Sequence, residues 1–265
     1  DGRAPWLRLA MTWTLTLAHL HQMLFVYAQT EAAYFPALLW TLSLLTGGTS
    51  APRTLALAAA CCAWAFATRF SGAALVAAGT LWILLRAPKE RRFMHAALFA
   101  AISAAPMLLV VLTRPGATGH TPGVHPPGAA MWEQLSIHLF TTFAPYKLLD
   151  LLTWKALLPL GAVALAALWR IAAPEQRRAA LLHPLHAAAY LALVLATMTW
   201  LDGALLMTER IAAPFVLGLL WFWVVLAASA WESGRSPAGR GAALALLLLP
   251  LVTGAVRAAG VVPRL

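Results

Sequence analysis

Charged residues are scarce in this chain. They make up 11% of its 265 residues, whereas hydrophobic residues make up 62% and the mean hydropathy is +0.76. A composition this apolar excludes an ordinary soluble protein, because a soluble chain needs far more charge on its surface. The polar–apolar alternation that marks a membrane β-barrel is also lacking. The sequence therefore predicts helices in a bilayer, where backbone groups must bond within their own segment.

Cysteine and the usual catalytic motifs are equally scarce. The two cysteines, Cys61 and Cys62, are adjacent and point to different faces of one predicted helix, which excludes a disulfide framework. The sequence has no glycine-rich phosphate loop, no CxxC pair, no nucleophile elbow and no repeat of fixed period. Its start, Asp1-Gly2-Arg3, includes neither an initiator Met nor a signal peptide, and we expect the chain to begin inside a longer protein.

Long apolar runs, in contrast, are abundant. A helix crosses the bilayer core with roughly 20 apolar residues, and runs near this length recur along nearly the whole sequence. We therefore predict an all-α fold, a polytopic integral membrane protein with about nine transmembrane segments and one long extracytoplasmic loop. The predicted segments are 7–28, 32–47, 54–69, 72–86, 93–113, 152–170, 179–200, 211–231 and 241–259.

Lys and Arg set the predicted orientation. Short cytoplasmic loops are enriched in both residues, and the basic loop at 86–92 fits this rule best. If the amino end is cytoplasmic, every loop in turn obeys the rule. Topology then explains the net charge of +10, and we expect no nucleic-acid partner. High Ala, Leu and Arg usage is typical of GC-rich bacterial genomes, so we expect a bacterial inner membrane protein with membrane lipids as partners.

The predicted topology gathers several charges on the extracytoplasmic side. Glu31 opens the second segment and Arg69 ends the third, so the hairpin brings both charges to one face. Ionisable groups at a membrane boundary are costly unless they are paired or used. Ser71 and Gly72 follow Arg69, and an Arg beside a helix end and a turn can present its guanidinium to a phosphate. Two simpler explanations stay open: Arg69 anchors the helix end, and Glu31 interacts only with the helix dipole.

Two further extracytoplasmic loops carry candidates. One precedes the eighth segment and contains Asp202, Glu209 and Arg210, for which a local ion pair and ligand binding are equally good explanations. The other, 114–151, begins with Gly and Pro and then becomes amphipathic, as an interfacial helix would. The apolar positions of that helix are Trp132, Leu135, Leu139 and Phe143. The histidines of this loop lie in no pattern that would fix a metal, so we predict no metal site.

Three short elements resemble the GT-C membrane glycosyltransferases, and most closely the bacterial relatives of the GPI-anchor mannosyltransferases. Ala-Gln-Thr-Glu-Ala at 28–32 is similar to the Tyr-Thr-Glu-Ser-like element that starts one helix in that family. Thr-Arg-Phe-Ser-Gly at 68–72 is similar to a Thr-Arg-x-x-Gly-like turn. Thr-Glu-Arg-Ile at 208–211 is similar to a late Arg-Tyr element, with Ile replacing Tyr. The resemblance implies that 1–265 is a single GT-C-like transmembrane domain.

The resemblance also implies an activity. It is the inverting transfer of mannose or another hexose from a polyprenyl-phosphate-linked donor to a lipid, glycan or protein acceptor on the extracytoplasmic side. Arg69 and Arg210 would contact the donor phosphate, with Lys147 as a weaker candidate, and 131–151 would cover the donor lipid. The supporting residues would be Asp202, Glu209, Ser71 and Gly72.

This chain departs from the family in one respect. The family's catalytic Asp or Glu lies in the first extracytoplasmic loop, and no residue here corresponds to it. Glu31 is the catalytic candidate in this sequence, and we expect the main base upstream of residue 1. The resemblance fixes no cofactor and leaves a divalent metal open. The alternatives are a transporter or flippase for lipid-linked or anionic substrates, and a non-catalytic subunit of a membrane complex.

Overall fold

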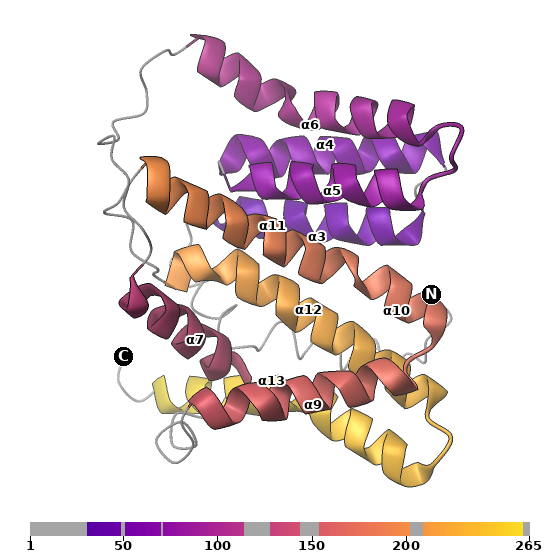
Figure 1. Cartoon of the computed structure of the whole chain (residues 1–265), viewed down its shortest axis with the longest axis vertical. Coiled ribbons are helices and arrows are strands. Elements are labelled where there is room, and N and C mark those ends of the chain that lie inside the picture. Colours follow the sequence, from indigo (N-terminus) through magenta and orange to yellow (C-terminus); the bar gives the residue numbers. More distant parts are fainter. Residues whose placement is uncertain are drawn as a thin grey trace. The chain divides into compact units, whose positions relative to one another are not determined.

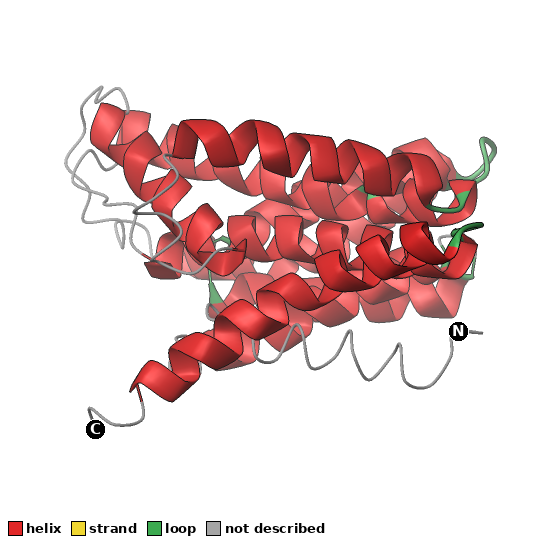
Figure 2. Cartoon of the chain, turned by 90° about the horizontal axis from the view of Figure 1, so that it is seen from below, coloured by secondary structure: helices red, strands yellow, loops and turns green. Residues whose placement is uncertain are grey.

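The computed structural model describes residues 31–48, 51–69, 71–113, 128–143, 154–201 and 209–261. These ranges contain helices and no strand (Figure 1; Figure 2), which confirms the predicted all-α class. The helices are α3 (Glu31–Gly47), α4 (Pro52–Thr68), α5 (Gly72–Arg86), α6 (Arg92–Thr113), α7 (Ala129–Phe143), α9 (Trp154–Ile171), α10 (Pro174–Ala180), α11 (Leu182–Ala196), the π-helical η1 (Thr197–Leu201), α12 (Glu209–Ser233) and α13 (Pro237–Val261).

The helix bounds agree with most of the predicted segments to within a few residues. The predicted segment 72–86 coincides with α5, because Gly72 and the basic loop after Arg86 mark both ends in the sequence. The predicted segment 179–200 is less regular, since it contains a break at Leu181 and ends in the π-helical η1. The first predicted segment, 7–28, lies outside the described residues.

Two helical stretches of the described chain are long and apolar enough to cross a membrane. They are Pro174–Trp200 and Ile211–Ser233. Four other apolar helical stretches are shorter: Ala33–Gly47, Gly72–Arg86, Pro159–Ile171 and Pro237–Thr253. The structure therefore supports a helical protein with membrane-spanning capacity, whereas the count of nine spans is not confirmed and stays a prediction.

The chain forms two compact units. One unit, called here the α4 unit, combines α3, α4, α5 and α6 with α11 and η1. The other, called the α12 unit, combines α7, α9, α10, α12 and α13. Each unit is assembled from segments that are far apart in the sequence, since residues 182–206 belong to the same unit as residues 28–128.

In the α4 unit, small residues let the helices approach closely. The face of α4 that packs inward carries Ala58, Ala59, Cys62 and Ala65, all buried. α3 and α6 both pack on α4, and α11 packs on α5 (Figure 1). Small side chains at helix contacts are typical of membrane proteins, where close packing replaces the hydrophobic effect between helices.

The contact between α5 and α6 depends on one glycine. A Cβ atom built on Gly79 would lie 2.6 Å from Cε1 of Phe99, and the Phe99 ring is fully buried. The ring therefore occupies the space that a side chain at position 79 would need. Two polar groups add bonds between helices: Trp82 Nε1 donates to the Leu45 carbonyl at 3.2 Å, and Ser103 Oγ donates to the Ala59 carbonyl at 3.3 Å.

In the α12 unit, α12 packs against all four other helices. Its inward residues include Leu217 and Leu220, both fully buried. Ser229 Oγ accepts a hydrogen bond from the Ala173 backbone N–H at 3.0 Å, which ties α12 to the start of α10. Trp223 Nε1 donates to the Leu246 carbonyl of α13 at 2.8 Å.

Arginine side chains close two helix ends in this unit. Arg177 Nε donates to the Ala172 carbonyl at 2.7 Å, just past the end of α9, and the guanidinium lies 6.0 Å from the ring centroid of Trp169. Arg240 Nε donates in the same way to the Gly234 carbonyl after α12, also at 2.7 Å. A cation at a helix C-terminus satisfies free carbonyls and interacts favourably with the helix dipole.

The stretch predicted as an interfacial helix forms α7, and its interfacial position stays a prediction. Among its predicted apolar positions, Leu135 is buried within the unit and Trp132 is 45% exposed. The face that packs inward runs through Met131, Leu135 and Thr142. Thr142 Oγ1 donates to the His138 carbonyl, so a polar residue can lie on this face without a lost hydrogen bond. The remainder of the predicted stretch, 144–151, lies outside the described residues.

Candidate functional site

The turn between α4 and α5 positions Arg69. The Arg69 backbone N–H donates to the Ala65 carbonyl at 3.1 Å, and Thr68 Oγ1 donates to the same carbonyl at 2.9 Å. Arg69 then leaves the helix in an extended conformation, with φ −152° and ψ 131°. Its carbonyl accepts a hydrogen bond from the Gly72 N–H at 2.8 Å, which starts α5. The backbone of the turn is thus bonded to itself, and the half-buried Arg69 side chain extends from a fixed position.

Gly72 is required for this turn to be so tight. A Cβ atom at position 72 would lie 2.4 Å from Cα and 2.6 Å from the backbone N of Phe66, in the last turn of α4. Backbone atoms cannot move aside as the end of a flexible side chain can. Glycine therefore lets α5 begin directly against α4, and this close start keeps Ser71 beside Arg69.

Two buried tyrosines face the same region from other helices. Tyr34 of α3 is fully buried and Tyr190 of α11 is 2% exposed. Arg69 lies close enough to both for its positive charge to act on their phenolic groups. The hydroxyls of Tyr34 and Ser71 lie near each other. We refer to Arg69, Ser71, Tyr34 and Tyr190 as the Arg69 cluster.

Two buried hydroxyls of the Arg69 cluster make no hydrogen bond within the part of the chain that the structure describes. Neither Tyr34 Oη nor Ser71 Oγ makes a hydrogen bond with good geometry to any part of the chain that the structure describes, although both atoms are buried. A buried polar atom without a partner costs about 1–3 kcal/mol, so its presence in a folded protein needs a reason, such as a bound water or ion, strain or a catalytic role. Tyr34 Oη and Ser71 Oγ lie near each other without a well-aligned hydrogen bond, so the Tyr34 hydroxyl can turn to another acceptor near Arg69.

This combination of groups suits an anion. Arg can bind a phosphate through two parallel N–H donors, and neutral hydroxyls can complete the oxygen coordination without adding charge. Partial burial strengthens the attraction, because the effective dielectric constant is lower than in water. Within the described residues, no group of three His, Cys, Asp or Glu side chains is placed to hold a metal ion.

The structure brings only some of the predicted site residues together. Arg69, Ser71 and Gly72 lie together in the α4–α5 turn. Glu31 is the first residue of α3, in the same unit, and the position of its side chain is not described. Glu209 and Arg210 begin α12, in the other unit, and their side chains are likewise not described. Lys147 and Asp202 lie outside the described residues.

The sequence reasoning missed Tyr34 and Tyr190. The chain has only four tyrosines, and each of these two stands within a largely apolar helix. A buried tyrosine usually directs its hydroxyl to a polar partner. The presence of a tyrosine in an otherwise apolar helix could therefore have indicated a polar site. Their meeting with Arg69 was not predictable from local pattern, because the three residues come from distant segments.

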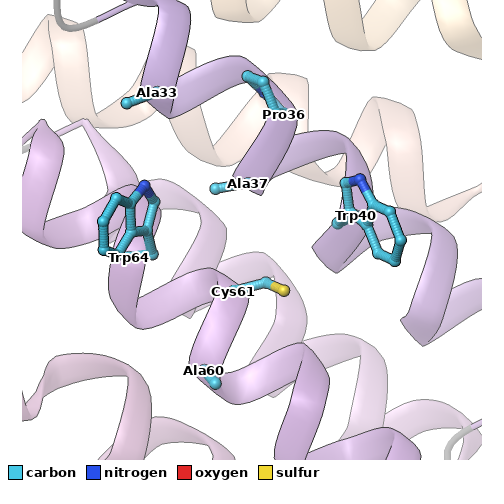
Figure 3. Close-up of a pocket in the computed structure, with 7 residues that line it drawn as sticks. All are labelled: Ala33, Pro36, Ala37, Trp40, Ala60, Cys61 and Trp64. Atoms are coloured by element: carbon cyan, nitrogen blue, oxygen red, sulfur yellow. The ribbon is translucent and has the colours of Figure 1, made fainter.

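A groove lies on the surface of the same unit, between α3 and α4 (Figure 3). Its volume is about 480 Å³. It is lined by Ala33, Pro36, Ala37, Trp40, Ala60, Cys61 and Trp64. Figure 3 shows the indoles of Trp40 and Trp64 on opposite sides of the groove, with Ala37 and Cys61 between them. Each of these tryptophans is 61% exposed.

Comparison with known proteins gives no assignment. No protein-family model matches the chain, and no curated protein or solved structure matches it significantly.

Proposed function

We propose that this protein is an integral membrane glycosyltransferase. It transfers mannose or another hexose, with inversion, from a polyprenyl-phosphate-linked donor to an acceptor on the extracytoplasmic side of a bacterial inner membrane. The observation that carries the proposal is the Arg69 cluster, in which a half-buried cation lies beside a buried tyrosine hydroxyl that has no partner among the described residues. The motif resemblance around 28–32 and 68–72 also supports it.

The outward faces of the α4 unit support the membrane location. α6 exposes Phe93, Leu109 and Leu112 at 67%, 63% and 71%, while its Phe99 and Ser103 are buried. A helix with several large apolar side chains outward and a serine inward is suited to lipid rather than to water. α6 covers the predicted segment 93–113, so its outward apolar side chains support the proposed membrane location.

The distribution of charge supports the orientation. Arg86, Lys89, Arg91 and Arg92 lie at the α5–α6 connection, whereas Arg69 lies at the α4–α5 turn, which is at the other end of α5. By the positive-inside rule the first group is cytoplasmic. Arg69 is then on the extracytoplasmic side, where a cation has no topological purpose and ligand binding explains it better.

The chemistry requires a cation for the leaving phosphate and a carboxylate base for the acceptor hydroxyl. Arg69 supplies the first, because negative charge develops on the phosphate as the sugar departs and a fixed cation stabilises it. Tyr34 and Ser71 donate to the remaining phosphate oxygens. Glu31, three residues before Tyr34 on α3, is the candidate carboxylate in this chain.

The proposal is tested with the protein in nanodiscs, supplied with radiolabelled polyprenyl-phosphate hexoses and a membrane extract as acceptor. We expect label to enter a new product, and Arg69→Ala to abolish the transfer. Arg53→Ala is the matched control, because Arg53 is exposed at the opposite end of α4 and should leave transfer unchanged.

The same preparation separates the alternatives. If the protein binds the donor without transferring its sugar, and moves the donor across proteoliposome membranes, its function is that of a flippase and not of an enzyme. Transfer that is unaffected by Arg69→Ala would remove Arg69 from the site even if the activity is real.

A further inference from the structure

The connection between α5 and α6 is strongly basic. Four cations lie within seven positions there, and Glu90 is the only acidic residue of the stretch; the cations are Arg86, Lys89, Arg91 and Arg92. We propose that this end of the α4 unit binds the phosphate head group of an anionic phospholipid at the cytoplasmic face of the membrane. The inference rests on the membrane location and orientation proposed above, and on neither the transferase activity nor the Arg69 cluster.

Two neighbouring side chains at the start of α6 carry polar atoms that make no hydrogen bond. Arg92 is the first residue of α6, and His95 follows three residues later on the same face of the helix. Arg92 Nε and His95 Nδ1 are both buried, and neither has a hydrogen-bond partner in the part of the chain that the structure describes. His95 as a whole is only 4% exposed. The several oxygens of one phosphate can satisfy both groups, and we refer to this pair as the Arg92 site.

The imidazole of His95 is directed toward the start of α6. Side chains of a helix tilt toward its N-terminus and cover the turn that precedes their own Cα. The turn that His95 covers is therefore the first turn of α6. No acidic residue lies in that turn, so nothing there compensates the positive end of the helix dipole. A phosphate at this point interacts favourably with the dipole as well as with Arg92.

α4 begins at the same end of the unit. Short connections reverse the chain between α4 and α5 and again between α5 and α6, so α4 and α6 run in the same direction (Figure 1). The hydrogen bond from Ser103 to the Ala59 carbonyl fixes their register. His95 lies about 12 Å along α6 from Ser103, and Pro52 lies about 10 Å along α4 from Ala59. The Arg92 site is thus level with the first turn of α4, which also contains no acidic residue.

Arg92 also reaches the side of α6 that faces lipid in the proposed arrangement. Its guanidinium lies 4.9 Å from the ring centroid of Phe93, which is 67% exposed. The outward face continues along α6 with Met94, Leu98 and Ile102, which are 61%, 50% and 37% exposed. A head group at Arg92 therefore has a strip of apolar side chains beside it for its acyl chains. This strip favours a phospholipid over a free anion, which has nothing to place there.

The excess of positive charge favours a lipid with a net negative charge. Zwitterionic phospholipids also contain a phosphate, but their ammonium group cancels its charge. Arg86, Lys89 and Arg91 lie in the same connection as Arg92, and together they repel an ammonium group and attract an anionic head group. A single cation near the head groups changes the affinity for an anionic lipid about fivefold.

The test measures which lipid lies beside α6. A bimane fluorophore is attached at Leu98→Cys in a protein that carries Cys61→Ser and Cys62→Ala. The nanodiscs contain equal parts of dioleoyl-phosphatidylglycerol and dioleoyl-phosphatidylcholine, and the chains of one lipid or the other carry bromine, which quenches bimane. The membrane charge is the same in both samples. We expect phosphatidylglycerol to be favoured about fivefold at this position. At Leu109→Cys, nearer the other end of α6, the ratio should be close to one.

Two adjacent arginines provide a matched pair of variants. Arg92→Gln should bring the ratio at position 98 close to one. Arg91→Gln removes the same charge from an exposed side chain and should leave the ratio above about threefold. His95→Leu should lower the ratio about twofold, while the melting temperature stays the same or rises, because His95 Nδ1 makes no hydrogen bond within the described residues. Arg69→Ala should leave the ratio unchanged.

Three results would overturn the proposal. Equal effects of Arg91→Gln and Arg92→Gln, or an equal preference at positions 98 and 109, would reduce the site to a diffuse attraction between charges. A ratio that is abolished by inorganic phosphate, but not by sodium chloride at the same ionic strength, would assign the site to a soluble anion. Each variant is checked for elution volume and melting temperature, and if Arg92→Gln is unstable, His95→Leu decides.

The proposed function can fail separately. A preference for phosphatidylglycerol in a protein that transfers no sugar would keep the Arg92 site and remove the enzyme. Transfer that depends on Arg69, in a protein without any lipid preference, would give the opposite result.

Discussion

Gly72 and Phe66 are in backbone contact: a Cβ atom on Gly72 would lie 2.4 Å from the Phe66 Cα. The contact joins the last turn of α4 to the first turn of α5 and sets the position of Arg69 between them. The close contact explains why the Thr-Arg-Phe-Ser-Gly element ends in glycine. The backbone conformation does not, because the φ angle of Gly72 is not in the left-handed region.

The first prediction concerns this contact. We expect Gly72→Ala to destabilise the protein by about 1–3 kcal/mol, because α4 and α5 must move apart to admit the methyl group. Gly161→Ala is the control, since a Cβ at that position in α9 meets nothing within 4 Å. The control should be neutral or stabilising by up to about 1 kcal/mol. The measurement is thermal unfolding in a Cys61→Ser background, followed through the reaction of the buried Cys62 with a thiol-reactive dye.

The second prediction separates a ligand role for Tyr34 from a structural one. Tyr34→Phe removes a hydroxyl that has no hydrogen-bond partner among the described residues. We therefore expect the melting temperature to stay the same or rise, while affinity for a lipid phosphate falls roughly tenfold, as for the loss of a hydrogen bond to a charged group. A large loss of stability with unchanged affinity would show that the hydroxyl is structural.

The third prediction concerns the arginine that closes α9. Arg177→Ala removes the 2.7 Å hydrogen bond to the Ala172 carbonyl and the contact with Trp169. We expect a loss of about 1–3 kcal/mol, because a carbonyl at a helix end loses a charged donor. Arg178→Ala, at the exposed neighbouring position, should change the melting temperature little. Equal effects of the two substitutions would mean that overall charge matters here rather than the capping bond.

The fourth prediction tests the tie between α12 and α10. Ser229→Ala leaves the Ala173 backbone N–H without its acceptor, which should cost about 1–3 kcal/mol. Ser136→Ala also removes a hydroxyl, but that hydroxyl donates to a carbonyl of its own helix, Trp132. We expect the Ser136 variant to melt within about 2 °C of the wild type, as surface substitutions usually do. A neutral Ser229→Ala would show that water replaces the serine at this helix start.

Much of the local structure was predictable from the sequence. α5 ends where glycine and a basic loop bracket an apolar run, and α6 begins within one residue of its prediction. The apolar content and turn residues fix where helices start and stop, because these are local properties. The face of α7 that packs into the protein was less predictable, because the sequence pattern did not indicate that Met131 and Thr142 would be buried beside Leu135.

The candidate site could be predicted only in part. Arg69 and Ser71 were evident because a cation and a turn stood together at the end of an apolar run. Tyr34 and Tyr190 were not, since their meeting with Arg69 depends on how α3, α11 and the α4–α5 turn pack, and no local pattern encodes that packing. The groove was hidden for the same reason, as its two walls come from separate helices.

The packing of the Phe99 ring against Gly79 has an evolutionary consequence. Any homologue that replaces Gly79 with a larger residue must reduce the ring at position 99, because the two atoms would otherwise lie 2.6 Å apart. Divergent members of this lineage should therefore show exchange of size between these two positions, with their combined volume held nearly constant. Such a compensated pair would identify shared ancestry in sequences whose short polar motifs have drifted beyond recognition.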